Sequence, residues 1–240
     1  MIKTQILEKG YVIYPNALPA QVTQELLNQI IHTPLPQDNS YFRAHQDLFA
    51  IRNLLGEIPS LKTILKNNQV QQILQQQFLT LPVRCIKAIY FDKPPQSNWV
   101  VNWHQDLTIN VKQKPNDVPK GFKKWIKKAG FWSVQPPVNY LENIVTLRIH
   151  LDECTVNNGA LKVLEASHIP GIKPSQNLTD LKKTYNEITC EVPKGGIFVM
   201  SPLLWHASSK NKSMRHRRVI HLEFSNLKLP EHLEWFEGQA

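Results

Sequence analysis

Two short stretches of the chain hold side chains that could bind one metal ion. His104 and Asp106 are separated by a single residue, so on an extended segment both side chains point to the same side. His206 follows the run MSPLLW, which predicts a position at the end of a strand that begins after the turn at 195–196. Two histidines and one carboxylate on one side of a metal form the facial set that suits non-haem Fe(II) and leaves three coordination positions open.

An arginine lies eleven residues beyond His206, at Arg217, directly before an apolar strand-like run. A guanidinium there could hold the distal carboxylate of a 2-oxo acid through a bidentate pair. His216 and His221 compete with His206 for the third ligand position, and Arg218 competes with Arg217. His216 lies in a basic run and His221 inside an alternating strand, so the spacing favours His206 and Arg217.

Three segments carry a resemblance to a known family. They are YFDKPPQSNWVVNWHQD (90–106), VQPPVNYLENIVTLRIHLDECTVNNGALKVLEASHIPG (134–171) and GGIFVMSPLLWHASSKNKSMRHRRVIHLEF (195–224). Here the chain resembles the phytanoyl-CoA dioxygenase family of Fe(II)/2-oxoglutarate-dependent oxygenases. The resemblance implies a double-stranded β-helix, with Fe(II) held by His104, Asp106 and His206. It also implies that Arg217 holds 2-oxoglutarate as co-substrate, with O2 as oxidant.

The same resemblance implies roles for further residues. Ser208, two residues after His206, matches a position that helps bind the co-substrate carboxylate, and Lys93 matches a lysine with that role. Relatives that halogenate have a small residue in place of the carboxylate. Because Asp106 is present here, hydroxylation of a C–H bond in a small-molecule substrate, or a related oxidation, is expected, with release of succinate and CO2. Desaturation, cyclisation and epimerisation are left open as outcomes.

Arg148 is a further candidate for binding co-substrate or substrate. It lies in the predicted strand 143–152, where it shares one face with Thr146 and His150 while aliphatic residues occupy the other. Either face could point inward, and a charged inward face is costly unless it lines a site. Distant members of the family have a Trp at this place.

The elements that must position these residues change in type along the chain. Residues 1–80 predict helices: one from Pro19 to Pro34, one over 46–55, and one from Pro59 to Phe78. Short strands then follow at 83–91, 107–111, 143–152, 160–164, 189–192, 196–200 and 218–224. We therefore expect a mainly β protein with flanking helices and a jelly-roll, cupin-like core over 81–226, in a single domain spanning 1–240.

The net charge of +9 comes from two local blocks. Residues 112–128 carry +6 and residues 210–218 carry +5, so the rest of the chain is slightly negative. We predict that 112–142 is a long, weakly patterned loop that acts as a lid, and that its charge favours an anionic substrate. Scattered cysteines, no apolar run of membrane-spanning length and no signal peptide predict a cytoplasmic protein without nucleic-acid or membrane partners. The oligomeric state is left open.

Two other functions fit parts of the pattern. One is a basic nucleic-acid-binding protein with a vestigial site, and the other is a jelly-roll hydrolase that uses a different metal. Arg217 and Ser208 favour the oxygenase, because a hydrolase has no need for a carboxylate clamp at that distance from the metal.

Overall fold

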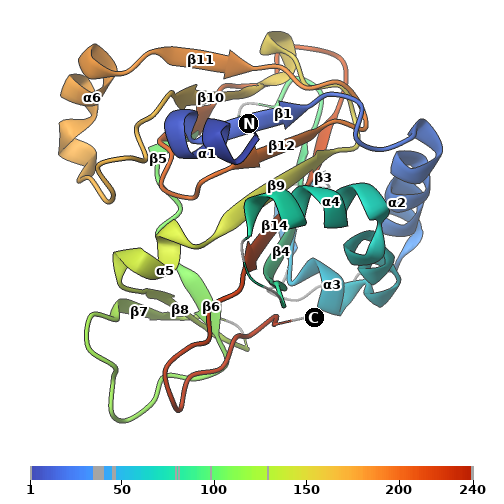
Figure 1. The fold of residues 1–240 in the computed structure, drawn as a ribbon. Helices are drawn as coiled ribbons and strands as arrows, with labels where there is room; N and C mark the ends of the chain where they lie inside the picture. Colours follow the sequence, from blue (N-terminus) through green and yellow to red (C-terminus); the bar gives the residue numbers. More distant parts are fainter. Residues whose placement is uncertain are drawn as a thin grey trace.

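The computed structural model describes residues 2–34, 41–44, 47–78, 80, 82–97, 99–128 and 130–238 (Figure 1). The largest sheet has seven antiparallel strands. In spatial order they are β1 (Tyr11–Tyr14), β12 (Ile197–Met200), β9 (Val145–His150), β14 (Arg217–Ser225), β4 (Arg84–Lys93), β3 (Asp47–Arg52) and β2 (Tyr41–Ala44).

Two smaller antiparallel sheets complete the β-structure. The four-stranded sheet has the order β11 (Glu187–Cys190), β10 (Leu161–Leu164), β13 (His206–Ser208) and β5 (Val101–His104). The three-stranded sheet has the order β6 (Ile109–Val111), β8 (Trp132–Gln135) and β7 (Lys123–Lys127). The seven- and four-stranded sheets line a common cavity and so face each other, which confirms the mainly β, jelly-roll class.

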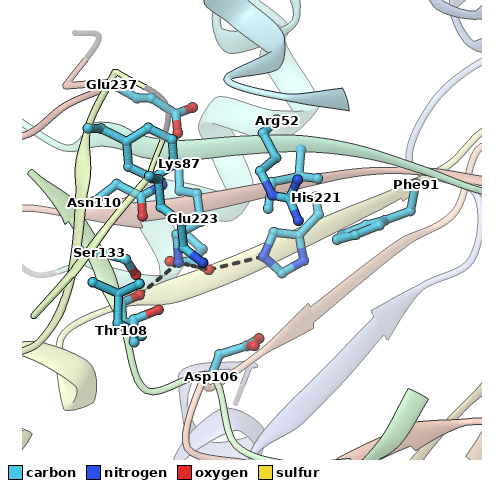
Figure 2. A pocket seen from close by; sticks show the side chains of 14 residues that line it. Arg52, Lys87, Phe91, Asp106, Thr108, Asn110, Ser133, His221, Glu223 and Glu237 are labelled. Carbon is cyan, nitrogen blue, oxygen red and sulfur yellow. Dashed lines mark hydrogen bonds and ion pairs between the residues drawn. The ribbon is translucent and has the colours of Figure 1, made fainter. Parts of the chain in front are cut away.

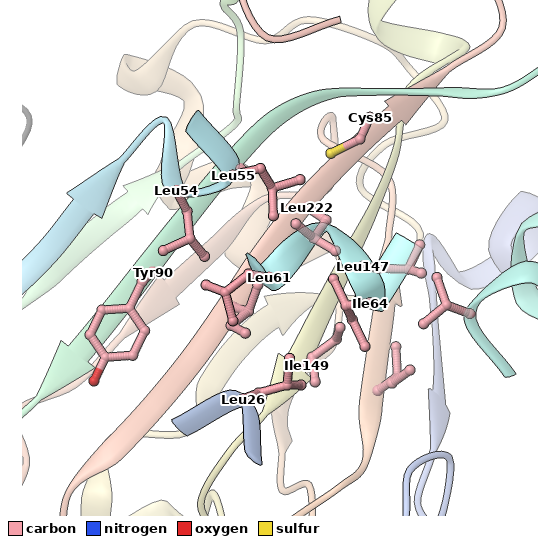
Figure 3. Close-up of a cluster of buried hydrophobic side chains, with 14 of the residues drawn as sticks. Leu26, Leu54, Leu55, Leu61, Ile64, Cys85, Tyr90, Leu147, Ile149 and Leu222 are labelled. Atoms are coloured by element: carbon pink, nitrogen blue, oxygen red, sulfur yellow. The ribbon is translucent and has the colours of Figure 1, made fainter. Parts of the chain in front are cut away.

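Helices cover the outer face of the seven-stranded sheet (Figure 1). They are α2 (Ala20–His32), α3 (Leu54–Glu57), a 3-10 helix (Pro59–Lys66) and α4 (Asn68–Gln77), with α1 (Ile2–Lys9) beside β1 and α4. The others are α5 (Val138–Glu142), α6 (Leu178–Thr184) and the short 3-10 helices Val156–Asn158 and Ser175–Asn177. Figure 3 shows leucines and isoleucines from these helices packed against aliphatic side chains of the sheet.

Strand β9 shows how the two faces of this sheet differ. Leu147 and Ile149 are fully buried in the apolar core beneath the helices. Arg148 and His150 alternate with them, as the period of a strand requires, and are buried on the opposite face. The charged face is therefore the inward one, toward the four-stranded sheet.

The N-terminal part is less helical than expected. The strands predicted between 83 and 224 are found as β4, β6, β9, β10, β11, β12 and β14. The helices from Pro19 and from Pro59 are also found, the second broken at Asn67. The helix expected over 46–55 is wrong: 47–52 form β3, which pairs with β4, and only 54–57 are helical. Residues 45 and 46 lie outside the described part.

The expectation of an irregular loop over 112–142 is also wrong. β7, β8 and α5 lie in this segment, and β8 pairs with both β6 and β7. Because all three lysines of β7 are exposed, the segment lacks the apolar alternation that would have revealed a strand. Within the described residues, none of the helices is long and apolar enough to cross a membrane.

Candidate active site

The two candidate histidine ligands lie opposite each other in the four-stranded sheet. His104 ends β5, His206 begins β13, and the two residues are paired in the antiparallel register. His206 therefore starts a new strand after the turn 201–205 and does not end β12. Asp106 follows β5, and its backbone N–H donates to the carbonyl of Pro202 over 2.8 Å. A carboxylate oxygen of Asp106 lies 3.6 Å from the Nε2 atom of each histidine.

Backbone contacts orient both imidazole rings. Nδ1 of His104 contacts the carbonyl of Asn102 at 2.7 Å, and Nδ1 of His206 contacts the carbonyl of Leu204 at 2.8 Å. A carbonyl only accepts, so each Nδ1 carries a proton, and Nε2, the atom nearer Asp106, is the one that a neutral ring can offer to a metal. The three groups can hold a metal ion.

The electrostatics of the three groups suit metal binding. Burial lowers the pKa of His206 to about 4, so its imidazole is neutral at physiological pH. Burial would also lower the pKa of His104, but the hydrogen bond and charge of Asp106 outweigh it and raise that pKa. Burial alone would raise the pKa of Asp106, but its interactions with the neighbouring histidines, His206 first, outweigh burial and hold that pKa well below the usual value.

A cavity of about 220 Å³ lies beside these three side chains, between the seven-stranded and four-stranded sheets. Arg148, Ser208 and Arg217 line it together with His104 and His206. Nε and Nη1 of Arg217 are buried and have no hydrogen-bond partner among the described residues. Unused donors on a buried guanidinium favour an anionic ligand, because leaving them unpaired is costly.

Lys93 adds a second cation behind the cavity wall. It is fully buried, and its ammonium donates to Oγ of Ser208 over 2.6 Å and to the carbonyl of Ser209 over 2.5 Å. Burial and the nearby Arg217 lower its pKa to about 7. Burial and Arg217 likewise lower the pKa of Arg148 to about 10. A dianion in the cavity would relieve this repulsion among three buried cations.

The turn at Gly159 packs closely against Lys93 and Ser208. Its φ of 81° lies in the left-handed region. A Cβ there would meet the carbonyl oxygen of Ser209 at 2.5 Å and the Lys93 side chain at 3.2 Å. The carbonyl of Gly159 also accepts from Ser208 Oγ over 3.1 Å. Glycine is thus required for the close packing around Lys93 and Ser208.

The competing residues from the sequence have other partners. Nδ1 of His216 lies 2.9 Å from a carboxylate oxygen of Asp92. Arg218 makes a bidentate pair with Asp152 at 2.6 and 2.7 Å. Neither His216 nor Arg218 lines the cavity.

Arg148 and His221, both named from the sequence, belong to a buried chain of side chains whose further members, Glu223 and Lys87, the sequence did not indicate. Nη1 of Arg148 donates to Nδ1 of His221 over 3.0 Å, so the His221 proton is on Nε2, which donates to Glu223 over 3.1 Å. Lys87 pairs with Glu223 at 2.9 Å and donates to the carbonyl of Thr108 over 2.8 Å. Both nitrogens of His221 are occupied, so His221 and Glu223 form a poorer metal site with Asp106 than the two facing histidines do. The alternation of polar and apolar residues along β14 was the sequence signal that could have placed His221 and Glu223 on one face.

This fold, with two histidines, a carboxylate and a cationic cavity between its facing sheets, defines the class of Fe(II)/2-oxoglutarate-dependent oxygenases. The family model described as "Phytanoyl-CoA dioxygenase (PhyH)" matches residues 6–219. The chain belongs to the phytanoyl-CoA dioxygenase family.

Several solved structures share this fold at low sequence identity. EctD from S. alaskensis, with 2-oxoglutarate and 5-hydroxyectoine, has a TM-score of 0.72 and 15% identity over 99% of this chain and 82% of that one. AviO1 from Streptomyces viridochromogenes Tue57 has a TM-score of 0.64 and 20% sequence identity over 95% of both chains. SnoK, an alpha-ketoglutarate-dependent carbocyclase from nogalamycin biosynthesis, has a TM-score of 0.64 and 14% sequence identity over 99% of this chain and 86% of that one. A search of curated protein sequences finds no match.

Proposed function

We propose that the protein hydroxylates a C–H bond of a small-molecule substrate, using Fe(II), 2-oxoglutarate and O2. His104, Asp106 and His206 hold the iron in this proposal. Arg217 holds the distal carboxylate of 2-oxoglutarate, assisted by Ser208 and Lys93. Related structures support the cofactors: EctD structures contain Fe in one case and 2-oxoglutarate with a hydroxylated compound in another.

One observation carries the proposal. Two buried nitrogens of the Arg217 guanidinium, Nε and Nη1, have no hydrogen-bond partner among the described residues, and this side chain lies in the same cavity wall as both candidate histidine ligands. A metal-dependent hydrolase needs only the metal and a water, and would gain nothing from a buried cation without a partner. A dicarboxylate that contacts both the metal and Arg217 accounts for the whole arrangement.

Each residue has a distinct part in the reaction. When bound, iron, 2-oxoglutarate and O2 together supply an oxidant strong enough to take hydrogen from a C–H bond, with loss of CO2 and formation of succinate. Because the backbone fixes both rings, His104 and His206 can present Nε2 to the metal without reorganisation. Asp106 supplies a negative ligand and takes the place that a halide would need. Arg148, held by His221, faces the cavity and adds positive charge near the co-substrate.

The test is an anaerobic titration of the purified apo-protein with Fe(II) and then 2-oxoglutarate. We expect the weak visible charge-transfer band of an iron–2-oxo acid chelate. His206→Ala should abolish the band, because it removes a buried ligand. His216→Ala is the matched control and should leave the band unchanged, since its ring contacts Asp92 outside the cavity. Strong iron binding without a band would contradict the proposal.

A further inference from the structure

A second, larger cavity adjoins the first. Its volume is about 340 Å³, and it shares Phe91, Asp106 and His221 with the smaller cavity. Figure 2 shows Arg52 of β3 on one side of it, the Lys87–Glu223 pair on the sheet, and Asp106 at its edge. The three-stranded sheet and the C-terminal segment close the remaining walls.

We propose that this larger cavity binds the substrate, and that the substrate is a small, hydrophilic anion whose negative group contacts Arg52 and Lys128. The inference rests on the proposed function, because it takes the smaller cavity to be filled by 2-oxoglutarate. A C–H bond must then reach the metal from another side. The larger cavity provides that approach, since a ligand in it would lie against Asp106.

Most of the lining residues carry polar groups that a ligand must satisfy, although their carbon atoms also form part of the cavity wall. Of its fourteen lining residues, only Ile89, Phe91, Ile126 and Phe131 are apolar. A long acyl chain would cover the remaining polar groups without offering them hydrogen bonds, at a cost for each. A volume near the lower end of small-molecule sites also favours a compact ligand over an acyl thioester with its large carrier.

The charge of the cavity indicates an anion. Lys87 and Glu223 neutralise each other, and Asp106 is assigned to the metal. Glu237 adds one negative charge, because its hydrogen-bond partners, the backbone N–H of Ala88 at 2.7 Å and the amide of Asn110 at 3.4 Å, are neutral, but two cations of the lining outnumber it. Arg52 and Lys128 remain. Among the described residues, no carboxylate forms an ion pair with either.

This assignment narrows the role of the lysine-rich segment. Residues 112–128 contain seven lysines, but of these only Lys128 lines the larger cavity. Lys127 is its neighbour at the end of β7, is equally exposed, and does not line the cavity. A general anion-attracting surface would use all seven lysines about equally, whereas a binding site depends on Lys128.

The experiment measures binding of three probes to the anaerobic protein loaded with Fe(II) and saturating 2-oxoglutarate. D-Gluconate is the hydrophilic anion, D-sorbitol is the matched polyol that lacks the carboxylate, and octanoate is an apolar anion of similar size. Calorimetry gives the affinities, and the visible band monitors the iron–2-oxoglutarate chelate throughout. We expect gluconate to bind about tenfold or more tightly than sorbitol, the effect of one charge-assisted hydrogen bond. It should also bind more tightly than octanoate, whose hydrocarbon chain leaves the polar lining groups without partners.

Variants locate the binding. Arg52→Gln and Lys128→Gln should each weaken gluconate binding about fivefold or more and leave the chelate band intact, while Lys127→Gln should change neither. Sorbitol or octanoate binding as tightly as gluconate overturns the inference. So does a gluconate affinity that neither Arg52→Gln nor Lys128→Gln alters, or the absence of gluconate binding while the band is present. Failure of the band itself overturns the proposed function instead.

Discussion

The two faces of the seven-stranded sheet have opposite chemistry although the same strands build them. Toward the helices, β4, β9 and β14 present aliphatic side chains in one continuous apolar core. On the opposite face, toward the two smaller sheets, the same strands present buried charged and polar side chains: Lys87, Lys93, Arg148, His150, Arg217, His221 and Glu223. Burying so many ionisable groups opposes folding. The apolar face thus supplies the stability that lets the other face be organised for ligands.

The largest expected effect is on the apolar face. Leu147 is fully buried against the helices, and Leu147→Ala should lower the free energy of unfolding by about 2–5 kcal/mol through lost burial and a cavity. Urea denaturation measures it. The molecules that remain folded should still form the iron–2-oxoglutarate chelate. A loss below about 1 kcal/mol would mean that this face is not the stabilising one.

The next comparison uses adjacent residues of β14 that point to opposite faces. Arg217→Met removes an unpaired buried cation, so we expect unchanged or higher stability and a loss of 2-oxoglutarate affinity of about tenfold or more. Arg218→Met removes the bidentate pair with Asp152, so we expect about 1 kcal/mol lower stability and unchanged 2-oxoglutarate affinity. Calorimetry and urea denaturation separate the two. If Arg218→Met instead of Arg217→Met lowered the 2-oxoglutarate affinity, Arg218 would be the residue that holds the distal carboxylate.

How much of the difference between the two faces of the sheet could be predicted from the sequence depends on how many alternating residues a strand contains. Strand β9 alternates strictly, so the sequence placed Arg148 and His150 on one face but left open which face points inward. The inward direction depends on which surface the N-terminal helices cover, and that packing brings together residues far apart in the chain. The triad and Arg217 were named from spacing and resemblance, and the structure brings them together around one cavity.

The errors have physical causes in particular residues. In β3, Ala50 and Ile51 are both buried because each face of the strand is covered, so the period of two disappears and the segment was interpreted as helix. β5 and β13 are too short for any period to be visible. Lys87, Glu223 and Glu237 were not named, since contacts between residues far apart in the sequence leave no local signal.

Lys93 tests whether the ligand-binding face opposes stability. Its pKa in the folded protein is about 7, against 10.5 for an ordinary lysine, because of burial and Arg217. Between these values the unfolded chain binds more protons, so the apo-protein should gain stability as pH rises from 7 toward 10.5. Lys93→Met should flatten this rise, measured by urea denaturation at several pH values. Exposed Lys194→Met is the control and should retain it. An equal slope in Lys93→Met would mean that the ammonium is solvated.

Glu237 gives the smallest effect, with the opposite sign. Burial raises its pKa to about 7 from 4.5, although hydrogen bonds from Ala88 and Asn110 partly offset this. Between these values the folded state holds the extra proton, so the contribution of Glu237 to stability falls as pH rises from 4.5 to 7. Glu237→Gln should remove that fall in urea denaturation, while exposed Glu234→Gln should not. An unchanged slope in Glu237→Gln would mean that the C-terminal segment leaves this wall of the larger cavity open to water. Opposite slopes from Lys93 and Glu237 would show that both are buried, because a solvated group titrates alike in the folded and unfolded states.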